Sequence, residues 1–451
     1  MKTLMNLKVF FYLSFLVLPS YIIGIAVTEI TLLFLIILFF IINKNFKYYK
    51  DPKILFLLLF SLLTAFSGLI NLNYNDLKIP AFFHFRYVLI TITIIYFIEE
   101  LFKEKNSFNK KFLNFFLLII SFLVFDSIVQ FFLGYNLFGQ EIIDSRVSGI
   151  FGEESVLGSF LLYILPIIFL LILNFEYDIK KNHIYLLLFF SFYFIAIYIS
   201  AGRTPFFLTI LFLILMILFD KNFKKILIKC STILFLFIVC EGYFQFGKTR
   251  PFHKLFIITF IQITDHYYHP RQMLDDNKTD QENSLKKKDD IKNLSSKNKL
   301  KEFFDNLKFF SDDHQNHYII AVKLFKEKPI FGSGPKGFRN YCRNVKYDPP
   351  IGICSTHPHN FFFQILSELG LAGILFYLFS IFFLVYKAIN SYLVKNENLK
   401  NSSFYICSIS LLILIFPFLP SGNFFNNWIS IVNYYYIGFY IYFYNQIYHQ
   451  G

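Results

Sequence analysis

The sequence has few charged residues and lacks the motifs by which many enzymes bind nucleotides. Charged residues make up 16% of the 451 positions and hydrophobic residues 56%, whereas about 45–50% apolar residues is typical of soluble domains. Neither a G-x-x-x-x-G-K-[ST] motif nor a dinucleotide-binding glycine pattern occurs, so nucleotide-driven transport has no support. The composition, with a mean hydropathy of +0.52, predicts an all-α integral membrane protein.

Apolar runs recur along the chain at the length needed to cross about 30 Å of hydrocarbon, roughly 17 to 25 residues. Twelve transmembrane helices are predicted, and the first two come from one long run that we divide at Thr28 and Glu29. The predicted spans cover residues 9–25, 27–43, 53–71, 81–98, 112–133, 154–174, 183–200, 204–219, 226–241, 360–386, 403–419 and 426–447.

Lysine is unevenly distributed among the connections between these spans. Eighteen lysines fall in one alternate set of connections, and only Lys78, Arg146 and Arg203 fall in the opposite short connections. Because short cytoplasmic loops are rich in Lys and Arg, we expect both termini in the cytoplasm and residues 242–358 outside.

This topology divides the chain into three parts: nine spans in 1–241, a large periplasmic loop in 242–358, and three spans in 359–451. Residues 272–300 of the loop are polar and mixed in charge, which is typical of a disordered insertion. The apolar spacing after residue 301 predicts short amphipathic helices.

Arginine is scarce, with seven residues against 36 lysines, and all seven lie on or near the outer side of the predicted topology. The guanidinium is a planar, bidentate group that suits phosphate and carboxylate. Contact with anionic lipid headgroups is the alternative interpretation for Arg250 and Arg271. It accounts less well for Arg86, Arg146 and Arg203, since Arg86 lies at a depth where charged groups are costly and usually face a cavity. We expect these last three arginines to converge on one face, where a diphosphate would suit them.

Two histidines flank a proline immediately before the tenth span. Pro358 favours an extended conformation at His357 and a helix start after it, so His359 and Asn360 are expected in the first helical turn, at the outer membrane boundary. A neutral imidazole there can act as a general base. The alternative is an interfacial or capping histidine.

Polar pairs also occur within the spans. Gln364 and Glu368 are four residues apart and can pair on one helix face, and Gly370 allows close packing. Asp126 and Gln130 form a similar predicted pair, which either lines a substrate groove or links helices.

A group of acidic residues and histidines in the outer loop resembles a metal site. Asp312, Asp313, His314 and His317 are close in sequence, but acidic residues at helix starts are commonly N-caps. No metal site is therefore predicted.

Only two of the five cysteines, Cys342 and Cys354, lie in the predicted outer loop. Disulfides persist in oxidising compartments, and a Pro-Pro turn between the two cysteines can bring them together. We expect a disulfide, worth about 3 kcal/mol in the chain-entropy model; the alternative is two free thiols. Cys230, Cys240 and Cys407 are expected as small apolar residues within spans.

The stretch "HNFFFQILSELGLAG" resembles the His-Asn, nine residues, Gly-x-x-Gly pattern of the O-antigen ligase family and the related O-antigen polymerases. "SAGRTPF", "RVSGIFGEESVLGSFL" and "KEKPIFGSGPKGF" resemble three further elements of that family. The resemblance implies a C-type glycosyltransferase fold. It also implies an inverting, metal-independent transfer of a glycan from undecaprenyl diphosphate to an acceptor hydroxyl, with no cofactor.

The resemblance also implies roles for particular residues. His359 would take the proton from the acceptor hydroxyl, with His357 and Asn360 supporting the helix mouth. Arg203 would bind the diphosphate, with Arg146 as a further partner.

One element departs from the family pattern. Where members commonly carry another arginine, this chain has His317. Either His317 replaces that arginine, or Arg339 or Arg343 reaches in. Arg86 completes the residues expected to bind the diphosphate.

The expected function is O-antigen ligation to lipid A-core at the periplasmic face of the bacterial inner membrane, with an undecaprenyl-diphosphate-linked glycan as donor. Repeat-unit polymerisation and glycan transfer to protein are alternatives. A transporter of lipid-linked sugar would also need many spans, but transporters tend to show two related halves, whereas this chain is asymmetric. Membrane lipid is an expected partner, and nucleic acid is not.

Overall fold

The computed structural model describes residues 11–43, 47–71, 79–102, 107–175, 177–261, 312–342, 354–393 and 399–448. Of these residues, 77% are helical and none forms a β-strand, which confirms the all-α prediction. Six of the described helices are long and apolar enough to cross a membrane, and three shorter apolar helices accompany them. These helices support an integral, multi-pass membrane protein.

Every predicted span after the first coincides with a helix. The helices are α3 (Ile25–Ile42), α4 (Pro52–Ile70), α6 (Phe85–Phe102), α7 (Ser107–Leu133), α8 (Leu157–Asn174), α9 (His183–Ile199), α10 (Arg203–Phe219), α11 (Lys224–Phe244), α17 (Phe361–Leu393), α18 (Leu399–Leu414) and α19 (Asn427–Tyr448).

The first predicted span, 9–25, is not one helix in its described part, and that prediction is wrong. The short helix α2 (Leu13–Leu16) is followed by a 3-10 turn, Pro19–Ile22. Proline lacks the N–H that a continuous helix needs, and Gly24 adopts a φ of 147°. The chain is therefore interrupted twice before α3 begins, and the total of twelve spans stays a prediction.

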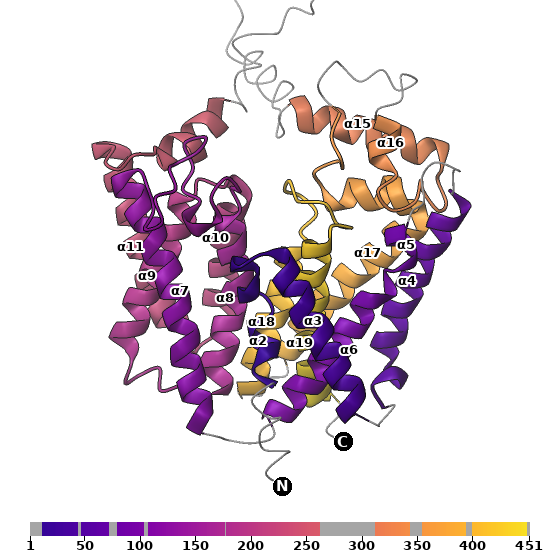
Figure 1. The fold of residues 1–451 in the computed structure, drawn as a ribbon, viewed down its shortest axis with the longest axis horizontal. Helices are drawn as coiled ribbons and strands as arrows, with labels where there is room; N and C mark the ends of the chain where they lie inside the picture. The colour runs from indigo at the N-terminus through magenta and orange to yellow at the C-terminus, as the bar shows by residue number, and fades with distance from the viewer. Residues whose placement is uncertain are drawn as a thin grey trace, which may run out of the picture.

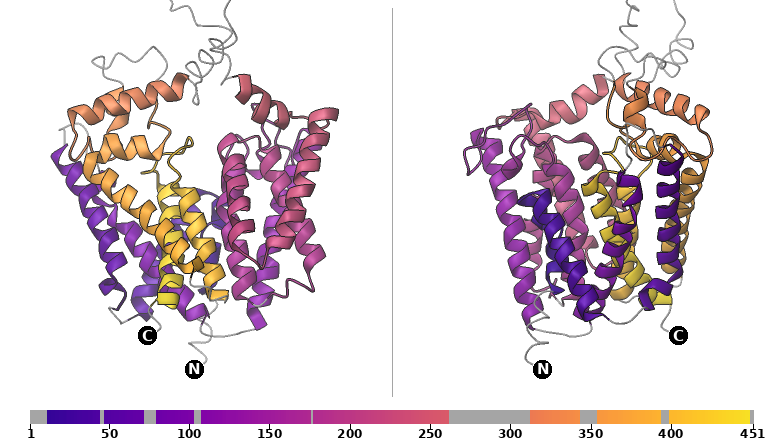
Figure 2. Two further views of the ribbon diagram at one scale, coloured as in Figure 1. Left: turned by 180° about the vertical axis from the view of Figure 1, so that it is seen from behind. Right: turned by 45° about the vertical axis from the view of Figure 1, so that its right-hand side comes forward.

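The helices form a bundle with two distinct upper parts. Helices α7 to α11 make up one side of the bundle, and α15 (Asp312–Glu327) and α16 (Phe338–Cys342) lie above α17 on the other side (Figure 1). Helix α19 packs along α6 and α18 in the centre, and the short α5 (Ile79–Phe82) precedes α6. Helices α15 and α16 lie at one end of the bundle, and the C-terminal end of α19 lies at the other (Figure 2).

Helices α15 and α16 occupy the region where amphipathic helices were expected. The predicted insertion at 272–300 and residues 301–311 lie outside the described residues.

Helix α17 is interrupted at Gly370, where φ is 64° and ψ is −156°. Residues 329–334 fold onto this break, and a Cβ atom at Gly370 would lie only 2.6 Å from the carbonyl carbon of Ile330. Non-helical backbone within a membrane protein is tolerated where other protein groups satisfy its hydrogen bonds. Four backbone hydrogen bonds do so here, from Ser333 to Ser367 (3.0 Å), from Gly334 to Glu368 (2.8 Å), from Leu371 to Pro329 (2.8 Å) and from Ala372 to Ile330 (3.1 Å).

Candidate active site

His359 lies just before α17, not in its first turn as predicted. Its φ of 57° is left-handed, and its carbonyl oxygen accepts a hydrogen bond of 2.8 Å from the N–H of Ser421. Asn360 caps the helix instead: its Oδ1 accepts from the N–H of Phe363 at 3.2 Å, and its Nδ2 donates to the carbonyl of Pro417 at 2.7 Å. Since asparagine is among the strongest N-cap residues, the helix begins after it and His359 stays outside.

Three other histidine rings surround His359. The ring centroid of His357 lies 4.1 Å away, that of His317 5.4 Å and that of His314 5.5 Å. The last two residues come from α15, where their spacing of three places them on one face. The sequence argument placed His317 near this site but did not include His314.

The four histidines do not form a preformed metal site. Within the described part of the chain, no group of three or more His, Cys, Asp or Glu is arranged to hold a metal ion. The side chains of Asp312 and Asp313 lie outside the described residues.

The histidines at the mouth of α17 are neutral at physiological pH. Burial, followed by the nearby His314 and His317, lowers the pKa of His359 to about 4. Burial, followed by His359, lowers the pKa of His357 to about 3. Desolvation and like charges both disfavour the imidazolium form, so His359 is in the protonation state that a general base requires.

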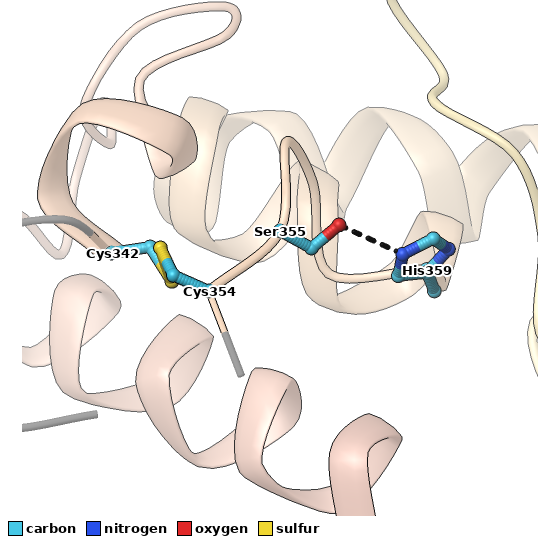
Figure 3. The surroundings of a disulfide bond; sticks show 4 residues. All are labelled: Cys342, Cys354, Ser355 and His359. Carbon is cyan, nitrogen blue, oxygen red and sulfur yellow. Dashed lines mark hydrogen bonds between the residues drawn. A yellow bond between two sulfur atoms is a disulfide. The ribbon is translucent and has the colours of Figure 1, made fainter. Parts of the chain in front are cut away.

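Cys342 and Cys354, the pair for which the sequence predicts a disulfide, are joined by one, with their Cα atoms 5.6 Å apart (Figure 3). Ser355 follows Cys354 directly, and its Oγ lies 2.9 Å from Nε2 of His359. The sequence argument missed Ser355, whose only signal is its place between the cysteine and the histidine. The remaining cysteines, Cys230, Cys240 and Cys407, are free.

A first group of cations lies on the α7–α11 side. Arg203 begins α10, and Arg146 lies in the loop between α7 and α8. Lys254, in the short π-helix His253–Ile257, belongs to the same group. Burial, followed by the charge of Arg146, lowers the pKa of Lys254; Arg203 adds to this effect and Asp144 opposes it. The sequence argument missed Lys254, because its contacts join segments far apart in the chain.

Buried polar side chains of α7 fix the loop that carries Arg146. Gln130 Oε1 accepts hydrogen bonds from the N–H groups of Ser148 (3.0 Å) and Gly149 (2.7 Å), and Asp126 Oδ1 accepts from the N–H of Leu137 (2.9 Å). Asp126 and Gln130 are both fully buried, as expected of the polar pair, but they bond to the loop rather than to each other. Both anchor the loop instead.

A buried carboxylate fixes the segment that carries Lys254. Glu241 is 1% exposed, and its Oε2 accepts hydrogen bonds from the hydroxyl of Tyr198 (2.5 Å) and from the N–H of Phe252 (3.1 Å). Lys254 Nζ in turn donates to the carbonyl of Asp144 at 2.6 Å, which joins this segment to the Arg146 loop.

A second group of cations lies beside the histidines. Burial, followed by the charge of Arg339, lowers the pKa of Lys336, while Glu368 opposes this effect and Arg86 adds to it. Arg86 Nη2 donates to Asn427 Oδ1 at 2.7 Å. Among the three arginines expected to converge, the structure therefore brings Arg146 and Arg203 together, and it places Arg86 with Lys336 and Arg339. The sequence argument missed Lys336, and Arg343 lies outside the described residues.

The predicted pair within α17 is present. Gln364 Nε2 donates to Glu368 Oε2 at 3.0 Å, and Glu368 Oε1 accepts from the N–H of Phe338 at 3.0 Å. Glu368 thus connects α17 to α16, beside the second group of cations.

Residues 186–378, a little under half of the chain, match the O-antigen ligase family model. This segment is similar to the domain that defines the O-antigen ligase family. The resemblance given by the sequence motifs is thereby confirmed. No curated protein matches the chain.

The O-antigen ligase domain supports a membrane glycosyltransferase of the O-antigen ligase or polymerase type. It contains His359, Arg203, Lys254 and Arg339, whereas Arg86 and Arg146 precede it. The histidine and most of the cations therefore belong to the family segment.

Proposed function

We propose that the protein transfers a glycan from undecaprenyl diphosphate to an acceptor hydroxyl at the periplasmic face of the bacterial inner membrane, with lipid A-core as the acceptor. The observation that carries this proposal is the neutral imidazole of His359 at the mouth of a membrane helix, inside the O-antigen ligase domain. A base in that position meets both a lipid-borne donor and an acceptor outside the hydrocarbon.

In the proposed reaction, His359 accepts the proton of the acceptor hydroxyl as its oxygen attacks the anomeric carbon of the glycan. The bond from that carbon to the diphosphate breaks, and the configuration inverts. The leaving diphosphate needs its charge neutralised, for which preorganised cations are effective. The cations that supply this charge are Arg203, Arg146 and Lys254, and the segments that carry them do not have to move.

The second cation group faces the same reaction from the histidine side. Arg339 and Arg86 are proposed to contact the diphosphate from there, with Lys336 beside them. His317, whose ring centroid is 5.4 Å from that of His359, stands where the family commonly has an arginine. His357 and Asn360 support the mouth of α17.

An apolar cavity within the bundle fits a lipid-linked substrate. It has a volume of about 550 Å³ and lies between α4, α17, α18 and α19. Phe56, Phe60, Phe376 and Tyr434 line it, and Ile365 lies in the first half of α17. We propose that it takes part of the polyprenyl tail, since an apolar wall suits a hydrocarbon chain.

The test is glycan transfer by the purified protein in lipid nanodiscs, with an undecaprenyl-diphosphate-linked glycan and lipid A-core. Wild type is expected to transfer, and His359→Ala is expected to lose about 10²- to 10⁴-fold in rate, the size of a general-base contribution, while still binding donor. A loss of only a few-fold would remove His359 from the reaction.

The acceptor is tested in the same assay. Transfer to a second donor-linked glycan in place of lipid A-core would identify a polymerase. Transfer to a protein hydroxyl would identify a protein glycosyltransferase.

A further inference from the structure

The two ring nitrogens of His359 have different surroundings. Nε2 lies 2.9 Å from Ser355 Oγ, whereas Nδ1 makes no hydrogen bond to another residue that the structure describes. In a neutral imidazole one nitrogen carries the proton and the other the lone pair, and the hydrogen bond at one nitrogen decides which. A hydroxyl can donate or accept, so the direction of the Nε2–Ser355 hydrogen bond decides which nitrogen is basic.

Hydrogen bonds fix the backbone at His359, so only the orientation of its side chain can still change. Its carbonyl oxygen is bound by Ser421, and the next residue, Asn360, is 1% exposed and bonded to both α17 and the carbonyl of Pro417. The neighbouring histidine rings limit rotation of the imidazole by packing, and the hydrogen bond with Ser355 is the contact that orients its nitrogens.

Ser355 is itself held in place by the disulfide. Cys354 is bonded to Cys342 at the end of α16 (Figure 3). Cys342 is fully buried in an apolar cluster with Phe338 and Leu324, and the N–H of Phe338 is bonded to Glu368. A short covalent connection thus runs from a packed helix to the serine that touches the histidine.

We propose that Ser355 is a positioning residue for His359, and that the Cys342–Cys354 disulfide acts through it. The Ser355 oxygen accepts the Nε2–H of His359, which leaves the lone pair on Nδ1 for the proton of the acceptor hydroxyl. Transfer therefore depends on the redox state of this disulfide. The inference rests on the proposed role of His359 as the base.

A phosphine reductant changes this state by balanced chemistry. The S–S bond breaks and both sulfurs become thiols, while the phosphine is oxidised to its oxide with an oxygen atom from water. Cys354 is then free of α16, and Ser355 is no longer held against Nε2.

The first test is the kinetics of Ser355→Ala. We expect kcat to fall about 10- to 100-fold, the size found when the hydrogen-bond partner of a metal-binding histidine is removed, with little change in KM. Ser355→Thr keeps a hydroxyl and is expected to recover most of the rate. Equal kcat values for wild type and Ser355→Ala would overturn the proposal.

The second test combines the variant with reduction. Reduction is expected to lower kcat of wild type to nearly the value of Ser355→Ala and to leave Ser355→Ala unchanged, because coupled changes do not add. The double variant Cys342→Ser, Cys354→Ser is expected to match reduced wild type. If reduction lowers kcat of Ser355→Ala by the same factor as wild type, the disulfide acts by another route and the proposal fails.

A third measurement does not depend on transfer. Diethyl pyrocarbonate modifies neutral imidazoles, and mass spectrometry of the peptide that contains His359 gives the rate of modification. The rate is expected to rise in Ser355→Ala and in reduced wild type, and Thr356→Val, whose hydroxyl contacts His357 instead, is the matched control.

The outcomes of this third measurement separate the two proposals. Equal rates in wild type and Ser355→Ala would overturn the positioning role even where transfer is observed. Raised rates in a protein that transfers no glycan would leave the positioning of His359 in place and remove its proposed role as the base.

Discussion

The cation group formed by Arg146, Arg203 and Lys254 and the histidine group around His359 are built in different ways. The cations lie on helix ends and loops. Buried side chains such as Gln130 and Glu241 fix these segments by accepting hydrogen bonds from their backbone N–H groups. The histidines sit on segments held by a disulfide and by a break in a helix. The charge-binding side therefore depends on hydrogen bonds to buried polar groups, and the base side depends on covalent and backbone connections.

This difference fits the two kinds of work that are proposed. A diphosphate is large and tolerates several cation arrangements, whereas a general base has to meet one proton at hydrogen-bond distance. The predictions below separate the two sides, because each changes one scaffold and leaves the other intact.

After His359→Ala, the largest effect is expected from Arg203. Arg203→Ala is predicted to lower kcat/KM about 10²- to 10³-fold, as for loss of one preorganised charge-stabilising donor. Arg203→Lys is predicted to be nearly as harmful, because an ammonium keeps the charge but loses the bidentate fork. Transfer by membranes that contain each variant measures this, and full activity of Arg203→Lys would show that only charge matters.

The next effect concerns the break in α17. Gly370→Ala places a Cβ atom 2.6 Å from Ile330, in a backbone conformation (φ 64°, ψ −156°) that is essentially restricted to glycine and costs other residues about 1–3 kcal/mol by itself. We expect a lower unfolding temperature in detergent and loss of transfer. Gly139→Ala is the control, because Gly139 has a φ of 81° with nothing within 4 Å of the added Cβ; if the two variants lose equal stability, the contact with residues 329–334 is not important.

A smaller effect is expected from Lys254. Lys254→Met removes one of three cations. It is predicted to raise KM for the donor about tenfold, which corresponds to roughly 1.4 kcal/mol of binding free energy. KM for the acceptor is predicted to change less. The control is Lys248→Met, because Lys248 lies in the same segment and its backbone N–H donates to the carbonyl of Phe131, a hydrogen bond that the substitution keeps. A change in KM for the acceptor alone would place Lys254 outside the donor site.

The smallest effect is expected from pH. A base works only when neutral, so its activity is complete above its pKa and falls as pH drops through it. Because the pKa of His359 is lowered to about 4, the plot of kcat/KM against pH is predicted to stay flat between about pH 5.5 and 8. A midpoint near the ordinary histidine value of about 6.5 would show that His359 is not the titrating base, or that substrate access changes its surroundings.

The sequence predicts those features that depend on nearby residues. The helices after the first predicted span, the Gln364–Glu368 pair and the bonded cysteines follow from hydropathy, helix spacing and the position of residues along the chain. The broken first span also had local signals, since Pro19 and Gly24 both disfavour a continuous helix.

The sequence does not predict features that join distant segments. Lys254 lies within the electrostatic influence of Arg146, on two separate segments that Glu241 and Gln130 hold. Lys336 lies within that of Arg86, which is far away in the sequence. The break at Gly370 depends on residues 329–334, which supply its hydrogen bonds. Such contacts need the packed structure, because no periodicity within one segment encodes them.

The four hydrogen bonds between residues 329–334 and 367–372 also define a unit for protein engineering. A chimera that exchanges α17 alone would place a helix that is interrupted at Gly370 next to a 329–334 loop that packs against a different helix. The carbonyl of Ser367 would then lose both of its donors from Ser333, and the carbonyl of Glu368 would keep only the bond from Ser67 Oγ. A buried unpaired group costs about 1–3 kcal/mol. Ser67 and Asn71 of α4 also bond to the backbone of this region, so an exchange would have to keep these two side chains together with residues 329–334 and 367–372.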